Sequence, residues 1–195
     1  MPEAHEGLQG RLGSRAVRRS AGILATTLFL MQAMTPAAQE VTEPALKAAF
    51  LYHFARFTTW PADGLSSPSA PMTMCVLGDQ AVGAALAQAV KHRQVAGHAI
   101  RVVQLGAGES AGACQVLYLS GLPAARIAGV VATVREVPVL TVSDSATFLK
   151  AGGIAQFHFQ KGQLRFVLAA DAASRAGLQL SSRILILSKK PTENP

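Results

Sequence analysis

The sequence contains only two cysteines among its 195 residues, Cys75 and Cys114, and no CxxC pair. Two sulfurs do not make a zinc site by themselves. Histidine is also sparse, because none of the five histidines stands four residues from another, the spacing that puts two metal ligands on one face of a helix. We therefore expect no metal site.

The motifs of common enzyme mechanisms are missing as well. No G-x-S-x-G occurs, and Ser120 in YLSGL lacks the flanking glycines of a nucleophile elbow. The stretch GAGESAG, residues 106–112, superficially looks like a dinucleotide-binding loop, but a predicted strand follows it where a helix would have to begin. No enzyme mechanism therefore emerges from these residues, and we expect no cofactor.

Charge is not gathered into a patch. The chain has 18 Lys and Arg against 11 Asp and Glu, a formal net charge of +7. The basic residues after the N-terminal segment stand singly, without the basic stripe and interleaved aromatic residues that nucleic-acid binding requires. Nucleic acid is therefore not an expected partner.

The N-terminal apolar run, AGILATTLFLM at residues 21–31, is too short to cross a bilayer, which takes about 20 residues. Four arginines precede it, and TPAAQE after it offers small residues for cleavage near Ala38. This pattern predicts a signal peptide at residues 1–38 and one exported domain at residues 39–195. Its removal takes away four Arg and two Glu and leaves 14 basic and 9 acidic residues, a net charge of +5.

Export to the periplasm has two consequences. No cysteine adjoins the cleavage site, so we expect neither a lipid anchor nor stable membrane insertion. In an oxidising compartment Cys75 and Cys114 are expected to form one disulfide that closes a loop of about 40 residues, with two buried free thiols as the alternative.

Aromatic residues are concentrated near the start of the predicted domain. Five of the chain's eleven fall within KAAFLYHFARFTTWP, residues 47–61. Apolar residues recur there at helical spacing, which predicts an amphipathic helix that ends before Pro61 and packs in the core. The side predicted to be buried consists of Leu46, Ala49, Phe50, His53, Phe54, Phe57 and Trp60.

Strands and helices then alternate along the chain. Strands are predicted at 72–78, 98–105, 114–120 and 138–144, and helices at 78–91, 121–134 and 145–153. Apolar strands that alternate with helices predict an α/β fold, a three-layer sandwich with a mostly parallel sheet. Right-handed crossovers favour the flavodoxin-like strand order 2-1-3-4, which makes the strands of Cys75 and Cys114 neighbours.

The last part of the chain has a different pattern. Residues 154–169 place Lys161-Gly162 between two alternating runs, which predicts an antiparallel hairpin. One or two helices follow, with Leu180, Ile184 and Leu187 as their buried stripe.

Two sets of residues are candidates for binding. Asp79 and Asp144 lie near the carboxyl ends of parallel strands, where open α/β sheets bind ligands, although helix capping also explains such aspartates. The hairpin and the last helix form a candidate interface for another protein. Its predicted residues are Gln163, Arg165, Phe166 and Arg183.

Several separated motifs resemble the YfiR-like family of exported bacterial proteins, over roughly residues 43–189. They are KAAFLYHFARFTTWP, MCVLGDQAVGAAL, ACQVLYLS, PVLTVSDSATFLKAGG and GQLRFVLAADAASRAGLQLSSRILIL. The resemblance implies a periplasmic, non-catalytic α/β protein that forms a homodimer. It also implies that the protein binds the periplasmic domain of an inner-membrane diguanylate cyclase and represses it, which lowers cyclic di-GMP and biofilm formation.

The cysteine spacing also matches a disulfide of that family, but the sequence departs from the family pattern elsewhere. No cysteine follows Cys114, so a second bridge is absent, and His53 and Ala169 stand where asparagine is usual. The alternative function is a periplasmic small-molecule-binding or transport accessory protein, with its ligand near Asp79 and Asp144.

Overall fold

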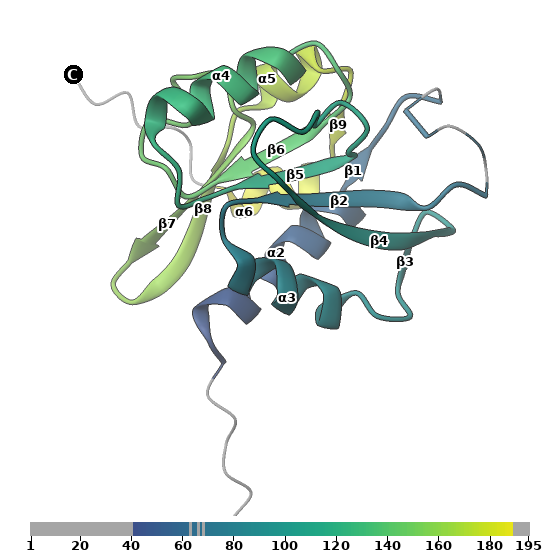
Figure 1. Ribbon diagram of the computed structural model, residues 1–195, viewed down its shortest axis with the longest axis horizontal. Coiled ribbons are helices and arrows are strands. Elements are labelled where there is room, and N and C mark those ends of the chain that lie inside the picture. The colour runs from purple at the N-terminus through teal and green to yellow at the C-terminus, as the bar shows by residue number, and fades with distance from the viewer. Residues whose placement is uncertain (1–40, 63, 66, 68, 189–195) are drawn as a thin grey trace, which may run out of the picture. The chain divides into compact units, whose positions relative to one another are not determined.

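Seven strands form one sheet in the computed structural model of the chain, in the order β3-β4-β2-β5-β6-β7-β8 (Figure 1). The structure describes residues 41–62, 64, 65, 67 and 69–188, which fall in one compact unit; the predicted signal peptide lies outside them. The elements in chain order are α2 (Glu43–Arg56), β1 (Thr58–Thr59), β2 (Met72–Leu77), α3 (Gln80–Ala89), β3 (Gln94–Val95), β4 (His98–Leu105), β5 (Val116–Leu119), α4 (Ala124–Val134), β6 (Leu140–Ser143), β7 (Ala155–Gln160), β8 (Gln163–Leu168), α5 (Ala170–Arg175), β9 (Gln179–Leu180) and α6 (Ser182–Leu187).

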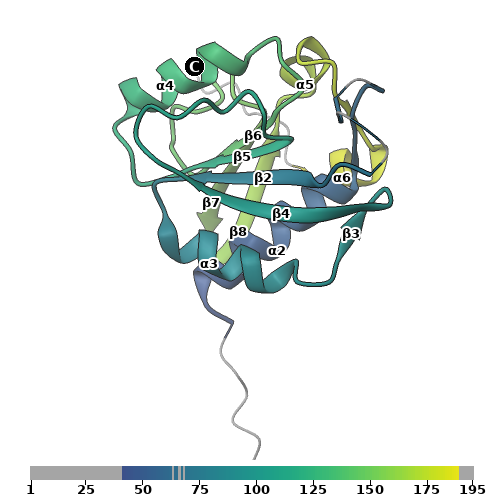
Figure 2. The same cartoon turned by 45° about the vertical axis from the view of Figure 1, so that its right-hand side comes forward.

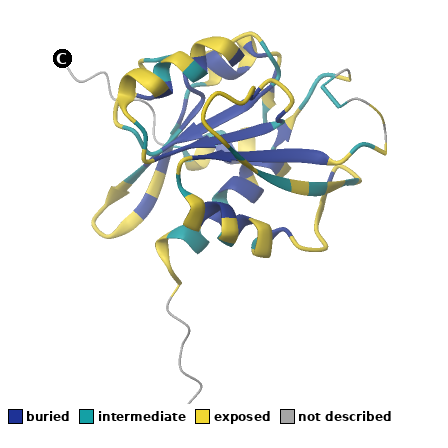
Figure 3. Ribbon diagram, viewed as in Figure 1, coloured by how far each residue is buried: buried dark blue, intermediate teal, exposed yellow. Residues whose placement is uncertain are grey.

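The centre of the sheet has the predicted topology. β4, β2, β5 and β6 are parallel neighbours, which is the 2-1-3-4 order of the four predicted strands. Every residue of β2, β5 and β6 is buried (Figure 3), as expected for parallel strands covered on both faces. The helices α2 and α3 cover one face and α4 and α5 the other (Figures 1 and 2), which confirms the three-layer sandwich.

The predicted disulfide joins two neighbouring strands of this sheet. Cys75 lies on β2 and Cys114 just before β5, and their Cα atoms are 5.9 Å apart. Both cysteines are buried in the core cluster that also contains Ile127 and Val131 of α4. The bridge therefore ties two central strands on the face that α4 covers.

The predicted hairpin is confirmed, and it also extends the sheet. β7 pairs with β6 in parallel, and β8 pairs with β7 antiparallel, with Gln160 opposite Gln163 at the turn. Lys161 and Gly162 both have positive φ, as the tight turn between two antiparallel strands requires.

The helix predicted at 145–153 is wrong, because this segment forms consecutive turns. The amide of Gly153 donates to the carbonyl of Phe148, 3.0 Å away, which brings the chain back toward the sheet. A Cβ at Gly153 would lie within 2.4 Å of the Phe148 ring, so the turn closes directly on that ring. Such a close return leaves no room for a regular helix between β6 and β7.

The α2 helix forms as predicted, but its buried side differs from the predicted one. It ends at Arg56, and its buried residues are Lys47, Ala48, Leu51, Tyr52, Phe54 and Ala55. Of the predicted side only Phe54 is buried, whereas His53 is exposed and the others are half-buried. The helix packs against α3 as well as against the sheet. Because of this second contact, the buried side of the helix is rotated away from the side predicted to be buried.

A two-residue ribbon joins the end of α2 to the segment that enters α6. Thr58 and Thr59 of β1 pair with Leu180 and Gln179 of β9, and the amide of Ser181 donates to the carbonyl of Phe57 at 2.9 Å. Beyond it, Ile184 of α6 is buried but Leu187 is 73% exposed, so the predicted stripe is wrong at Leu187. Leu187 therefore leaves an apolar side chain exposed on this side of the molecule.

Candidate functional site

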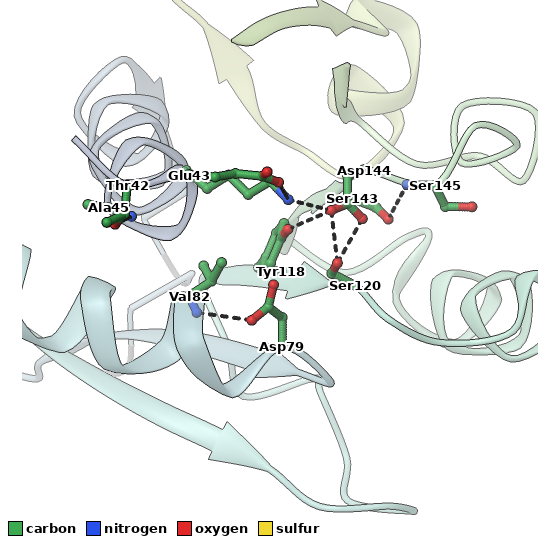
Figure 4. Close-up of polar contacts among 11 residues, drawn as sticks. Thr42, Glu43, Ala45, Asp79, Val82, Tyr118, Ser120, Ser143, Asp144 and Ser145 are labelled. Carbon is green, nitrogen blue, oxygen red and sulfur yellow. Dashed lines mark hydrogen bonds and ion pairs between the residues drawn. The ribbon is translucent and has the colours of Figure 1, made fainter. Parts of the chain in front are cut away.

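A polar cluster occupies the edge of the sheet where β5 and β6 end (Figure 4). The Asp144 carboxylate accepts hydrogen bonds from Lys47 Nζ at 2.7 Å, Tyr118 Oη at 3.1 Å and Ser120 Oγ at 2.8 and 2.9 Å. Lys47 Nζ also forms an ion pair with Glu43 at 2.6 Å. The cluster therefore holds one ammonium between two carboxylates.

Chain topology explains how these residues meet. Tyr118 lies on β5, Ser120 follows β5, and Asp144 follows β6, so the parallel strands deliver all three to one edge. Lys47 arrives from α2 on the covering layer and is 5% exposed. A buried lysine needs partners of opposite charge, and the two carboxylates supply them. The cluster thus anchors α2 to the sheet edge.

The environment shifts the pKa of both charged partners away from their ordinary values. Burial alone would raise the pKa of Asp144, but hydrogen bonds from Lys47 and Ser120 and the charge of Lys47 hold it below its ordinary value. Burial would lower the pKa of Lys47, yet hydrogen bonds to Asp144 and Glu43 raise it above the ordinary range. Burial raises the pKa of Tyr118, which stays a neutral donor.

Substituting Asp144 with Asn is expected to lower the free energy of unfolding at pH 7 by about 1–3 kcal/mol, because the Lys47 ammonium loses a charged partner. A depressed folded-state pKa gives stability that is present above the ordinary carboxyl pKa of about 4 and is lost as pH falls through the folded value. Urea unfolding should be measured between pH 2.5 and 7. The free energy of unfolding should fall less steeply with decreasing pH in Asp144→Asn than in wild type.

The matched control for this measurement is Asp171→Asn, which changes an exposed carboxylate of α5 outside the cluster. In this control, the free energy of unfolding should fall with decreasing pH as steeply as it does in wild type. An Asp144→Asn variant with the same slope as wild type would show that the cluster contributes nothing to acid stability.

The other predicted ligand-edge residue, Asp79, has a local role. Its Oδ1 accepts a hydrogen bond from the Val82 amide at 3.1 Å and caps the N-terminus of α3. β5 separates its strand, β2, from the strand β6 that precedes Asp144. A ligand held by both aspartates stays a prediction, and a cavity of about 380 Å³ lies beside Asp144 alone, lined by Glu43, Lys47, Asp144, Ala146, Gln156, Phe157, His158 and Phe159.

The second candidate surface is an apolar pocket of about 480 Å³ beside the helix α2, which we call the α2 pocket. Its residues come from α2, from Phe57 just after it, from β8 and from α6. They are Leu46, Ala49, Phe50, His53, Phe54, Arg56, Phe57, Phe166, Ile184 and Leu187. Arg56 is the only charged residue among them, so the pocket offers an apolar floor with a basic rim. Six of these residues belong to the side of the helix that the sequence placed in the core.

The structure divides the predicted interface residues between two faces. Phe166 is 7% exposed and packs on Phe54 and Phe50, with ring centroids 5.0 and 5.7 Å apart, at the floor of the α2 pocket. Gln163 and Arg165 are exposed and alternate with buried residues on β8, so they point to the opposite side of the strand. Arg183 is exposed on α6, near the pocket residue Ile184.

Within the described part of the chain, no group of three or more His, Cys, Asp or Glu side chains is placed to hold a metal ion. The helices of that same part include none with the length and apolar character needed to cross a bilayer.

The fold and these surfaces define a mixed α/β domain. It has a polar cluster of mutually hydrogen-bonded side chains at one sheet edge and an apolar pocket beside α2. Comparison of the sequence with known protein families identifies the family of this domain. The chain belongs to the YfiR/HmsC-like family, whose pattern matches residues 44–189. The resemblance seen in the sequence motifs is thereby confirmed.

A solved structure shows the same fold at low sequence identity. It is described as a conserved domain protein from Vibrio cholerae O1 biovar El Tor, and it is 14% identical with a TM-score of 0.51. The similarity covers 76% of this chain and 60% of the Vibrio chain, so this chain spans less than two thirds of that length. No curated protein matches the sequence.

Proposed function

We propose that this chain is an exported, non-enzymatic regulator that binds the periplasmic domain of an inner-membrane diguanylate cyclase and represses it. Membership in the YfiR/HmsC-like family is the observation that carries the proposal. Residues 1–38 are the signal peptide in this proposal, and residues 39–195 act in the periplasm as a homodimer. Repression would lower cyclic di-GMP and biofilm formation.

The α2 pocket supplies the surface that such a regulator needs. Interfaces place apolar residues at the centre and polar residues at the rim, and the pocket has this arrangement with Arg56 beside its apolar floor. A basic rim favours a partner segment that carries an apolar side chain with acidic neighbours. Repression also requires the pocket to bind the inactive conformation of the cyclase more tightly, because equal affinity for both conformations shifts no population.

The first experiment is co-purification of residues 39–195 with the periplasmic domain of a membrane-bound diguanylate cyclase from the same organism. We expect a stable complex, and Leu187→Asp should weaken it at least about tenfold, because a buried carboxylate would meet the apolar floor. The readout is the dissociation constant measured by titration calorimetry.

Ile186→Asp is the matched control for this experiment. Ile186 is 82% exposed on the same helix and is not among the residues of the α2 pocket, so the substitution adds the same charge one position away. We expect its affinity to equal that of wild type. Equal weakening by both variants would remove the pocket from the proposal, and absence of any complex, with unchanged cyclic di-GMP on gene deletion, would overturn the function itself.

A further inference from the structure

The cavity of about 380 Å³ beside Asp144 lies at the point where β6 stops and β7 continues, and we call it the β7 groove. β6 ends at Ser143 and pairs with β7 over two residues only. β7 runs on to Gln160, and the β7–β8 hairpin projects from the rest of the sheet (Figures 1 and 3). The wall of the groove consists of Glu43, Lys47, Asp144, Ala146 and residues 156–159, all of which the structure describes.

The backbone of Phe159 is open on the side of the groove. Residues of an antiparallel pair alternate between those that bond across the pair and those that face away from it. The Ala169 amide donates to the Ile154 carbonyl at 2.8 Å, which makes these two a bonded pair. Counting along the pair from there, Phe159 and its opposite residue Leu164 face away from each other. Among the described residues, none pairs with the Phe159 backbone on its other side.

An open strand edge of this kind is a template for another strand. Its unpaired N–H and carbonyl groups bond readily to an extended chain that lies alongside, which is how several protein domains bind peptides. Phe159 offers one donor and one acceptor for this purpose, and Phe157 faces the same side where β6 stops. An extended segment in the groove would therefore take the place that β6 leaves beside β7.

The side chain of Phe159 lies on the face of the sheet that α2 covers. It is two residues from Phe157, whose ring packs on Phe54 of α2 with centroids 5.5 Å apart, and alternate strand residues share a face. Phe159 is 50% exposed, and Glu43 of α2 lines the same groove. An added strand would also place every second side chain on this face. In the simplest register, one residue lies beside Phe159 and another, two positions away, beside Glu43.

Charge in the groove favours a basic occupant. Glu43 and Asp144 share the ammonium of Lys47, at 2.6 and 2.7 Å, and these are the only ion pairs among the described residues (Figure 4). The three groups together carry an excess of one negative charge. The side chain of Glu43 is 52% exposed, so its carboxylate is accessible to a further cation. Complementary charge therefore selects a lysine or arginine at the position beside Glu43.

We propose that the β7 groove binds an extended basic segment of another protein as an added strand. The segment pairs with the backbone of Phe159, places an apolar side chain against the Phe159 ring and places a lysine or arginine against Glu43. This peptide site is distinct from the α2 pocket. It goes beyond the proposed repressor function and does not depend on it.

The test uses the synthetic peptide Ac-Ser-Thr-Val-Thr-Lys-Thr-Ser-NH₂, which carries an apolar and a basic side chain two positions apart. In a ¹H–¹⁵N spectrum of residues 39–195, we expect a saturable downfield shift of the Phe159 amide proton as the peptide is added, because a strand hydrogen bond deshields that proton. Exchange of this amide with solvent should slow at the same time. The Leu164 amide is the internal control, because it faces the outer edge of β8, and it should not shift.

Two altered peptides separate the contributions of charge and backbone. With glutamate in place of the lysine, the peptide should bind at least about tenfold more weakly, because its carboxylate meets Glu43. Methylation of the Val, Thr and Lys amide nitrogens at the centre of the peptide removes its backbone donors in every register. The methylated peptide should give no saturable shift.

A protein variant tests the basic position directly. Glu43→Gln should bind the lysine peptide about threefold more weakly than wild type does, the loss expected for a partly exposed ion pair. Glu136→Gln is the matched control, because Glu136 is an exposed carboxylate just after α4 on the opposite face of the sheet. It should keep the wild-type affinity. The unfolding midpoints of both variants are measured alongside to show that they fold.

Four results would overturn the proposal. They are the absence of a saturable shift at Phe159, equal affinity for the lysine and glutamate peptides, a shift at Leu164 in place of Phe159, and a Phe159 amide that exchanges slowly without peptide but rapidly on dilution. The third would place the peptide on the outer edge of β8, and the fourth would assign the groove to a second copy of the chain. No cyclase domain enters these measurements, so their failure leaves the test of the repressor function unaffected.

Discussion

Phe54→Ala is expected to lower the free energy of unfolding by about 3–5 kcal/mol. Phe54 is 1% exposed and contacts three other rings, with centroids 5.0 Å from Phe166, 5.5 Å from Phe157 and 6.2 Å from Phe50. Its truncation leaves a cavity between α2 and the β7–β8 hairpin that these packed rings cannot fill. Urea unfolding of residues 39–195, followed by circular dichroism, measures the loss.

Phe57→Ala is the comparison for this experiment. Phe57 is half-buried beside the α2 pocket, so its truncation should cost clearly less stability than that of Phe54 and should weaken binding of the cyclase domain more. A loss below about 1 kcal/mol for Phe54→Ala would mean that α2 is not packed as described.

Removing the disulfide is expected to have an effect of similar size. The bridge between Cys75 and Cys114 spans 39 residues, and constraint of the unfolded chain by such a loop is worth about 4 kcal/mol on the chain-entropy model, with 2–5 kcal/mol typical for native bridges. The double variant Cys75→Ala, Cys114→Ala should therefore unfold at a clearly lower urea concentration than the oxidised wild type.

A reducing agent provides the control, because these two cysteines are the only ones in the chain. Dithiothreitol should bring the wild-type midpoint close to that of the double variant and leave the double variant unchanged. A wild-type midpoint that dithiothreitol does not move, with two thiols titratable after denaturation, would show that the bridge does not form in the purified protein.

The sequence predicts the centre of this fold well because its signals there are local. Buried strands such as Met72–Leu77 are apolar at nearly every position, and the alternation of strands with helices leaves few possible topologies. The failures occur where tertiary contacts decide the structure. The turn at 145–153 depends on the Phe148 ring against Gly153, and the orientation of α2 depends on its contact with α3.

The same distinction applies to the candidate site. Asp144 is recognisable from its place after a parallel strand, but Lys47 is 97 residues away in the chain and Tyr118 is 26. Lys47, which stands between the apolar residues Leu46 and Ala48, was the one signal that could have found the cluster, since a buried lysine requires an acidic partner. The α2 pocket was missed because an aromatic stripe at helical spacing normally indicates core.

The ribbon of β1 and β9 has a consequence for how the α2 pocket would accept a partner. One wall of the pocket comes from α2 and another from α6, and the pairing of Thr58 with Leu180 fastens these two distant parts of the chain together next to it. The distance between the walls is thus set before any partner arrives, so association costs little ordering of the backbone. In the proposed function, the affinity of this pocket would therefore depend on how well the shape of the partner segment matches it.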